Sequence, residues 1–244
     1  MKISLKDLNI YKNLLQMNKI KHVIKENMVN ICVRHQILEE SYEIKVTSKL
    51  VTNSIFCDFL NITTINYYPK DSYVFFNCIN QTNKIKYNLE TGKYYVEKGF
   101  ENHPVRGVNW YGALLFAYMC DGRLLTELEF ESIVKDIDYT KCNYGNKYGL
   151  TTPVDFFNAN EDGIFDSMGN LRVWCMDVYD PKVKYVCNCE MELIEDTYYR
   201  VVKGNAWDKT DIHFDKYLHE GKWARVGTMG IGFRVVIGDY PIKI

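Results

Sequence analysis

The sequence predicts a loop-rich α+β domain with short antiparallel strands and about three to four helices. Before residue 135, apolar residues recur at helical spacing, whereas later segments are short, rich in aromatic and β-branched residues, and separated by glycines. The 244 residues are 47% hydrophobic and 14% aromatic, which is typical of a packed globular protein. A chain of this length can bury one large core or two small ones.

The overall charge argues against several classes of partner. The formal net charge is −1, so no global field directs the chain to nucleic acid, to a membrane or to an acidic partner. No apolar run reaches the roughly 18 residues that a membrane span needs. The first residues also lack the apolar stretch and cleavage site of a secretory signal. We therefore expect a cytoplasmic protein with no membrane span and no nucleic-acid partner.

The N-terminal segment is basic and amphipathic. Residues 1–30 carry six lysines against one Asp and one Glu. Apolar residues recur at helical spacing at Ile10, Leu14, Met17, Ile24 and Met28. Such a helix can dock a partner or an anionic surface, or it can pack on the domain with its lysines in solvent, which is the commoner case. We assign residues 1–38 to this helix and its lead-in, and residues 39–244 to the main domain.

The next segment predicts a strand, a helix and a hairpin. Residues 42–47 alternate apolar and polar side chains, which indicates a half-buried strand. Thr52 and Asn53 can cap a helix whose apolar face continues to Leu60. Residues 62–100 contain short strands and turns, with a turn at 88–92 before a strand at 93–97.

Two further helices have clear start signals. Asn109 is a good N-cap for an almost wholly apolar, and therefore buried, helix that Gly122 ends. Thr126 and Glu129 have the spacing of a capping box, in which the hydroxyl and the carboxylate each accept a free backbone N–H. Phe130 begins the core face of that third helix.

After residue 135 the pattern predicts strands joined by long loops. The expected strands are Leu171–Val178, Tyr199–Val202 and Ile231–Ile237.

The eight cysteines do not indicate a disulfide scaffold, because a chain of this length needs no such cross-links. Cys57 and Cys120 lie in apolar helical patterns, where a thiol behaves as a small hydrophobic group. Cys187 and Cys189, in a polar loop, form the one pair that could be reactive or bind a metal.

Five short motifs recur in a fixed order along the C-terminal part of the chain. They are His103–Ala113, Gly122–Glu131, Gly163–Trp174, Lys203–Trp207 and Gly232–Arg234. In this order the chain resembles the formylglycine-generating-enzyme-like (sulfatase-modifying factor) family, whose domain is a variant of the C-type-lectin fold. Val51–Leu60 extends the resemblance upstream, so that it covers roughly residues 40–240.

The motif residues themselves favour structural roles. Asn170 after Gly169 can adopt a left-handed turn and bind neighbouring backbone. Arg234 can satisfy buried carbonyl groups, or it can pair with an acid such as Glu129.

The resemblance also implies which cofactors to consider. The family's oxygen-dependent formylglycine generators bind copper(I) through two cysteines after the fourth motif, but the same offsets here give Lys209 and Phe214. Soft thiolates suit this ion, so the substitution argues against copper(I). Iron stays possible at His213 and His219, with neighbouring aspartates, as oxygen and nitrogen ligands.

Calcium is similarly disfavoured by the resemblance. Val173 stands where relatives place a potential carboxylate ligand. Oxygen ligands nevertheless remain upstream, at Asp155, Asn158, Asn160, Glu161 and Asp162.

Three functions follow as hypotheses. The first is a protein that binds a peptide, a protein or a small polar ligand, or that assists a modifying enzyme. Its candidate residues are Trp207, Asp208, Asp211, His213, Tyr217, Trp223 and Arg225.

The second hypothesis is a non-heme metal-dependent oxidoreductase, with His213 and His219 or Cys187 and Cys189 as its metal or thiol site. The third is a nucleic-acid or membrane-tethered module that acts through residues 1–30, which the neutral charge of the remainder disfavours.

Overall fold

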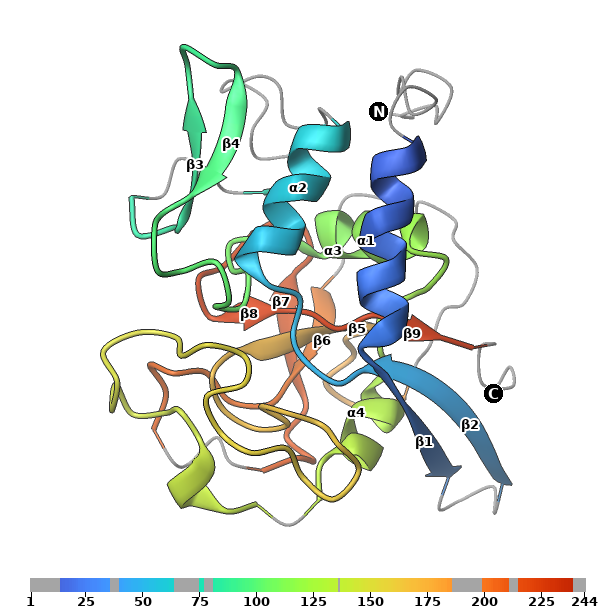
Figure 1. The fold of residues 1–244 in the computed structure, drawn as a ribbon. Helices are drawn as coiled ribbons and strands as arrows, with labels where there is room; N and C mark the ends of the chain where they lie inside the picture. Colours follow the sequence, from blue (N-terminus) through green and yellow to red (C-terminus); the bar gives the residue numbers. More distant parts are fainter. Residues whose placement is uncertain are drawn as a thin grey trace.

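The computed structural model describes residues 14–35, 40–63, 75–76, 81–135, 137–185, 199–210 and 215–238, and these form a mixed α+β fold (Figure 1). The helices are α1 (Leu14–Glu26), α2 (Asn53–Thr63), α3 (Trp110–Met119) and α4 (Glu127–Ile133). The strands are β1 (Met28–His35), β2 (Glu40–Thr47), β3 (Ile85–Asn88), β4 (Lys93–Val96), β5 (Arg172–Val178), β6 (Tyr199–Lys203), β7 (Glu220–Trp223), β8 (Ile231–Gly232) and β9 (Val236–Ile237). The predicted fold class is confirmed.

The strands form three small sheets. The largest has the order β7-β6-β5-β8, in which β8 is parallel to β5 and the other pairs are antiparallel. A second sheet has the order β1-β2-β9, and β3 pairs with β4 as a separate hairpin. The described part of the chain contains no helix with the length and apolar character that crossing a bilayer requires.

Strand β5 separates two hydrophobic cores. Its alternate residues Trp174 and Met176 enter the core that α1, α2 and α3 cover. Val173 and Cys175 point to the opposite side, into the core formed with β1, β2 and α4. Figure 1 shows these two groups of elements on opposite sides of the central sheet. Because side chains of a strand alternate between faces, one strand serves both cores.

The N-terminal helix packs on the domain. Met17, Ile20 and Ile24 are buried in the first core, while Lys21 and Lys25 pair with Asp121 at 2.6 and 3.3 Å. The predicted helix is too long at its C-terminal end, because α1 stops at Glu26 and Met28 already pairs with Thr47. The sequence Met-Val-Asn-Ile-Cys-Val has the alternation of a strand, and all eight residues of β1 pair with β2.

Two neighbouring expectations about the N-terminal region lie outside the described residues. They are the helical position of Ile10 and the boundary between residues 38 and 39.

The last predicted strand is divided in two. Residues 231–237 form β8, which pairs with β5, and β9, which pairs with β2. Between them, Phe233 fills the first core and Arg234 enters a buried polar site, so the chain leaves one sheet for the other. Strand β7 lies in a segment that we expected to be an exposed loop.

The predicted helix caps are confirmed. The Asn109 side chain accepts a hydrogen bond from the Gly112 backbone N–H at 2.9 Å. Thr126 and Glu129 form the reciprocal capping box of α4. The Glu129 carboxylate also takes two hydrogen bonds from Arg123, each 2.7 Å long, inside the protein.

Arg234 satisfies carbonyl groups, which decides between its two predicted roles. Its guanidinium donates to the carbonyl oxygens of Thr47, Ser48 and Asp166 at 3.0, 2.9 and 3.1 Å, and also to that of Phe165. Glu129 is not its partner, because Arg123 occupies that carboxylate. Burial lowers the pKa of this guanidinium to about 10. One side chain therefore joins the end of β2 to the loop before β5.

We predict that Arg234→Leu lowers the free energy of unfolding by about 3–5 kcal/mol, because it leaves several buried carbonyl oxygens without their donor. Arg234→Lys keeps the charge but lacks the planar guanidinium group, so its free energy of unfolding should lie between those of Arg234→Leu and the parent. Urea unfolding measures both. Arg34→Leu, on the exposed face of β1, is the control and should change stability by less than about 0.5 kcal/mol. A loss below about 1 kcal/mol in Arg234→Leu would contradict this account.

Candidate ligand-binding surface

The segment before β7 is fastened to helix α4 and strand β6 at three points. Lys216 Nζ donates to the Val134 carbonyl oxygen, at the C-terminal end of α4, over 3.1 Å. Lys203 Nζ, from β6, donates to the Leu218 carbonyl oxygen over 2.8 Å. His219 Nδ1 contacts the Glu127 carboxylate at 2.9 Å. Residues 215–220 are therefore held along the length of α4 although they contain no regular structure of their own before β7.

Beneath this segment lies a buried ionic cluster. Lys203 Nζ lies 3.0 Å from Glu127 Oε1 and 2.8 Å from Glu131 Oε1, and all three side chains are almost completely buried. The Tyr185 hydroxyl donates to the second oxygen of Glu131 at 2.8 Å. Burying charges is favourable only when each is well paired and hydrogen-bonded. Here one ammonium serves two carboxylates on successive turns of α4.

His219 completes the cluster and has no ring nitrogen directed to open space. Its Nδ1 faces Glu127, and its Nε2 lies 2.8 Å from the Asp180 carbonyl oxygen. Each ring nitrogen therefore faces an oxygen atom of the protein. The ring also stacks on Tyr179 with centroids 4.8 Å apart. In this position His219 fastens the segment to α4.

Asp177 supports the N-terminus of α4 from strand β5. Its Oδ2 accepts the Glu127 backbone N–H at 2.7 Å. Burial, with a smaller effect of the nearby charge of Glu127, raises the pKa of this carboxyl group to about 7, although that hydrogen bond acts to lower it.

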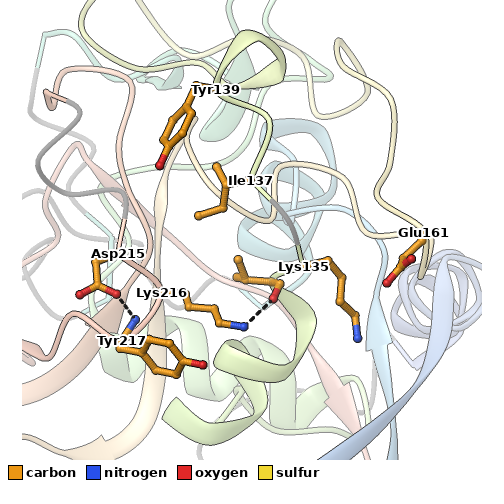
Figure 2. A pocket seen from close by; sticks show the side chains of 8 residues that line it. Lys135, Ile137, Tyr139, Glu161, Asp215, Lys216 and Tyr217 are labelled. Carbon is orange, nitrogen blue, oxygen red and sulfur yellow. Dashed lines mark hydrogen bonds between the residues drawn. The ribbon is translucent and has the colours of Figure 1, made fainter.

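An open hollow of about 560 Å³ lies beside the fastened segment (Figure 2). It is lined by Val134, Lys135, Ile137, Tyr139, Glu161, Asp215, Lys216 and Tyr217. Tyr139 and Tyr217 are 49% and 47% exposed, and Figure 2 shows them above and below the hollow. Asp215 Oδ1 accepts the Tyr217 backbone N–H at 2.8 Å, which shapes the turn that presents this tyrosine.

The predicted ligand-binding residues lie in three places. Tyr217 lines the hollow. Trp207 and the exposed Asp208 lie near the turn at 144–146, where the Asn146 N–H donates to the Trp207 carbonyl oxygen. Trp223 is 50% exposed and lies opposite Tyr199 across β6 and β7, and Arg225 follows beside the N-cap of α3. Asp211, His213, Cys187 and Cys189 lie outside the described residues.

Sequence reasoning missed the other side of the hollow. Lys135, Ile137, Tyr139 and Glu161 come from two loops that carry no motif. It also missed the role of Lys203, although this residue begins the fourth motif, because its partners Glu127 and Glu131 are more than 70 residues away in the sequence.

The residues at the expected copper position do not fit copper(I). Lys209 provides no sulfur, and its backbone is held in a turn with Ala206 and Gly145. Phe214 lies outside the described residues. Among the residues that the structure describes, no three His, Cys, Asp or Glu side chains converge as a metal site would require.

Three of the five oxygen ligands considered for calcium are engaged with the protein. Asp155 pairs with Lys49 at 3.0 Å, and Asp162 pairs with Lys135 at 3.0 Å. The Asn160 side-chain oxygen accepts two backbone N–H groups of its own loop. Val173 lies in the second hydrophobic core, where a carboxylate would be costly to bury.

Comparison with known proteins identifies the domain. A family model described as the sulfatase-modifying factor enzyme 1-like domain matches residues 22–136 and 133–238. The serine/threonine-protein kinase pkn1 of Chlamydia caviae is 29% identical over 188 residues, which are 71% of this chain and 29% of the kinase. The formylglycine-generating enzyme of Thermomonospora curvata is 28% identical over 102 residues, 31% of this chain and 34% of that enzyme. The chain thus spans about a third or less of the length of these relatives.

Two solved structures share the fold. PvdO from Pseudomonas aeruginosa has 16% identity and a TM-score of 0.57, over 86% of this chain and 91% of PvdO. CarF has 15% identity and a TM-score of 0.58, over 88% of this chain and 98% of CarF. At these identities the likeness concerns the fold alone.

We predict that Asp177→Asn gains stability relative to the parent as the pH rises from about 4 to 8. The parent's folded state keeps a proton on Asp177 up to about pH 7, whereas the unfolded chain loses it near pH 4. The stabilising contribution of this proton is therefore present at low pH and is lost as the pH rises through that window. The free energy of unfolding of Asp177→Asn relative to that of the parent should therefore rise by about 4 kcal/mol over this pH range, at 1.36 kcal/mol for each pKa unit.

Urea unfolding at several pH values measures this trend, and Asp121→Asn provides a control of opposite sign. The hydrogen bond from Lys21 holds the pKa of the Asp121 carboxyl group below its usual value. The stability that Asp121 contributes is therefore present at neutral pH and lost on acidification. If the free energies of unfolding of Asp177→Asn and the parent change in parallel with pH, the pKa of Asp177 is not raised in the folded protein.

Proposed function

The chain belongs to the sulfatase-modifying factor enzyme 1-like family, and from this premise we propose that it is a recognition domain that binds a peptide or small polar ligand, or assists a modifying enzyme, through described residues of the segment 205–228. The observation that carries this proposal is the exposure of large aromatic side chains on a fixed backbone. Tyr217 and Trp223 are about half exposed, while the residues between them are anchored to α4 and to β6.

Fixed aromatic side chains suit recognition for a physical reason. Tyr and Trp provide a large contact area and have few rotatable bonds, so little conformational entropy is lost when they bind. Here the anchors Lys203 and His219 have already ordered the backbone. Binding energy gained at the surface is then not spent on ordering the loop.

Two further observations support recognition over copper-dependent formylglycine generation. Lys209 replaces one of the two sulfur donors that copper(I) would need. In a protein named as a serine/threonine-protein kinase, a similar segment makes up only 29% of the chain. That proportion favours a domain that accompanies a separate activity. The alternative is a non-heme metal-dependent oxidoreductase, which the following experiment also tests.

We predict that screening a phage library of random peptides on the immobilised protein yields peptides that bind it. Their affinity for the Tyr217→Ala and Trp223→Ala variants should be at least about tenfold lower than for the parent. A tenfold loss corresponds to about 1.4 kcal/mol, a modest value for an interface aromatic residue. Isothermal titration calorimetry with the selected peptides measures it. Tyr118→Ala is the matched control, because Tyr118 is 49% exposed on α3 and should change affinity less than twofold.

The same preparation should be tested for metals by mass spectrometry after purification without a chelating tag. Enrichment of no peptide above a control protein would refute the recognition role. Stoichiometric iron or copper, together with oxygen consumption in the presence of a thiol peptide, would establish the alternative instead.

A further inference from the structure

The two lysines of the hollow are already paired. Lys135 lies 3.0 Å from a carboxylate oxygen of Asp162, at the rim. Lys216 donates to the Val134 carbonyl oxygen, where the α4 helix dipole places its negative end, and its Nζ lies 5.2 Å from the Tyr217 ring centroid. Each ammonium thus already has a partner within the protein, and Figure 2 shows the contact of Lys216.

The remaining charge of the hollow is negative. Asp215 and Glu161 line it from different loops, and Asp162 adds a third carboxylate next to Lys135. With Asp162, which pairs with Lys135 but is not itself part of the lining, three carboxylates accompany two ammonium groups. The Asp215 side chain uses Oδ1 for the Tyr217 N–H, which leaves its charge close to the exposed tyrosine ring.

The uncharged part of the lining suits the stem and head of a basic side chain. Ile137, which is partly exposed, provides the apolar surface of the hollow, whereas the Val134 side chain is buried in the second hydrophobic core. Tyr139 and Tyr217 expose about half of their surface at the edges, and the face of a tyrosine ring attracts cations. Lysine and arginine place their methylene stems along apolar surface while their charged heads seek carboxylates.

We propose that this hollow binds a lysine or arginine side chain of a peptide ligand. This proposal rests on the recognition function proposed above and specifies that the ligand is basic. The cation lies between the rings of Tyr139 and Tyr217 and is neutralised by Asp215 and Glu161. An acidic side chain would be repelled by these carboxylates, and the two lysines already have partners within the protein.

The test uses pools of random octapeptides in which one central position is fixed as Arg, Lys, Gln or Glu. Binding of each pool to the whole immobilised chain is measured by biolayer interferometry at low and at 0.5 M salt. We expect the Arg and Lys pools to bind at least about tenfold more tightly than the Glu pool, and this preference to weaken at high salt. The preference should fall at least about fivefold in Tyr139→Ala and in the double variant Asp215→Asn with Glu161→Gln.

Asn at position 215 keeps an oxygen for the Tyr217 N–H, so this change removes charge while it preserves the turn. Glu90→Gln, on the exposed turn of the β3–β4 hairpin, and Tyr118→Ala are the matched controls and should leave the preference unchanged. Circular dichroism confirms that each variant is folded.

The outcomes separate this inference from the function on which it rests. If the pools bind without preference for Arg and Lys, the basic-ligand proposal fails while recognition stands. If the preference persists in the hollow variants but disappears in Trp223→Ala, the hollow is the wrong site. If no pool binds above a control protein, both proposals fail.

Discussion

The structure depends on side chains that satisfy buried backbone carbonyl groups. A fold with long loops and short strands leaves many carbonyl oxygens without a partner in a helix or sheet, and a buried one without a donor is costly. Arg234 serves the end of β2 and the loop before β5, and Lys203 serves the Leu218 carbonyl oxygen. Arg200, from the same strand as Lys203, donates to the Met176 carbonyl oxygen on β5.

The ionic cluster follows from the same constraint. Lys203 can donate to a buried carbonyl group only if its charge is neutralised, and the first two turns of α4 supply Glu127 and Glu131. The position of Glu127 in the first turn is itself favourable, because the positive end of the helix dipole lies there. His219 then uses the remaining capacity of Glu127 to fix the chain before β7. The surface segment is therefore held by contacts with the interior of the protein.

Features set by near neighbours in the sequence could be predicted. The capping box needs residues three apart, and both hydrogen bonds of Thr126 and Glu129 are present. Asn170 adopts the predicted left-handed conformation, with φ of 62°, although the backbone to which its side chain bonds is that of Thr152, 18 residues earlier. Apolar spacing also predicted the buried helix α3 and the strand β5. In each case a local rule and the tertiary structure agree.

Features set by distant partners could not be predicted in the same way. Arg234 had two predicted roles. The structure decides between them, because its guanidinium donates to the carbonyl oxygen of Thr47, 187 residues earlier in the sequence, and Glu129 is already paired with Arg123. The end of α1 was misplaced because Met28 continues the helical spacing, whereas pairing with β2 makes it a strand residue. The hollow joins loops around Tyr139, Glu161 and Tyr217, and no pattern within one loop indicates that the others will meet it.

The separation of interior and surface explains how a member of this family can change its chemistry while it keeps its fold. Glu129, Asn170 and Arg234 are buried and each makes several hydrogen bonds, so replacing any of them leaves buried groups unpaired. Lys209, by contrast, holds its turn through its backbone N–H and carbonyl groups. Every residue except proline, which lacks the N–H, has both groups. A side chain there can exchange a sulfur donor for an ammonium group without disturbing that turn. Motifs of the interior thus identify the family, while the residues that we propose for ligand binding lie on surfaces where the fold imposes little.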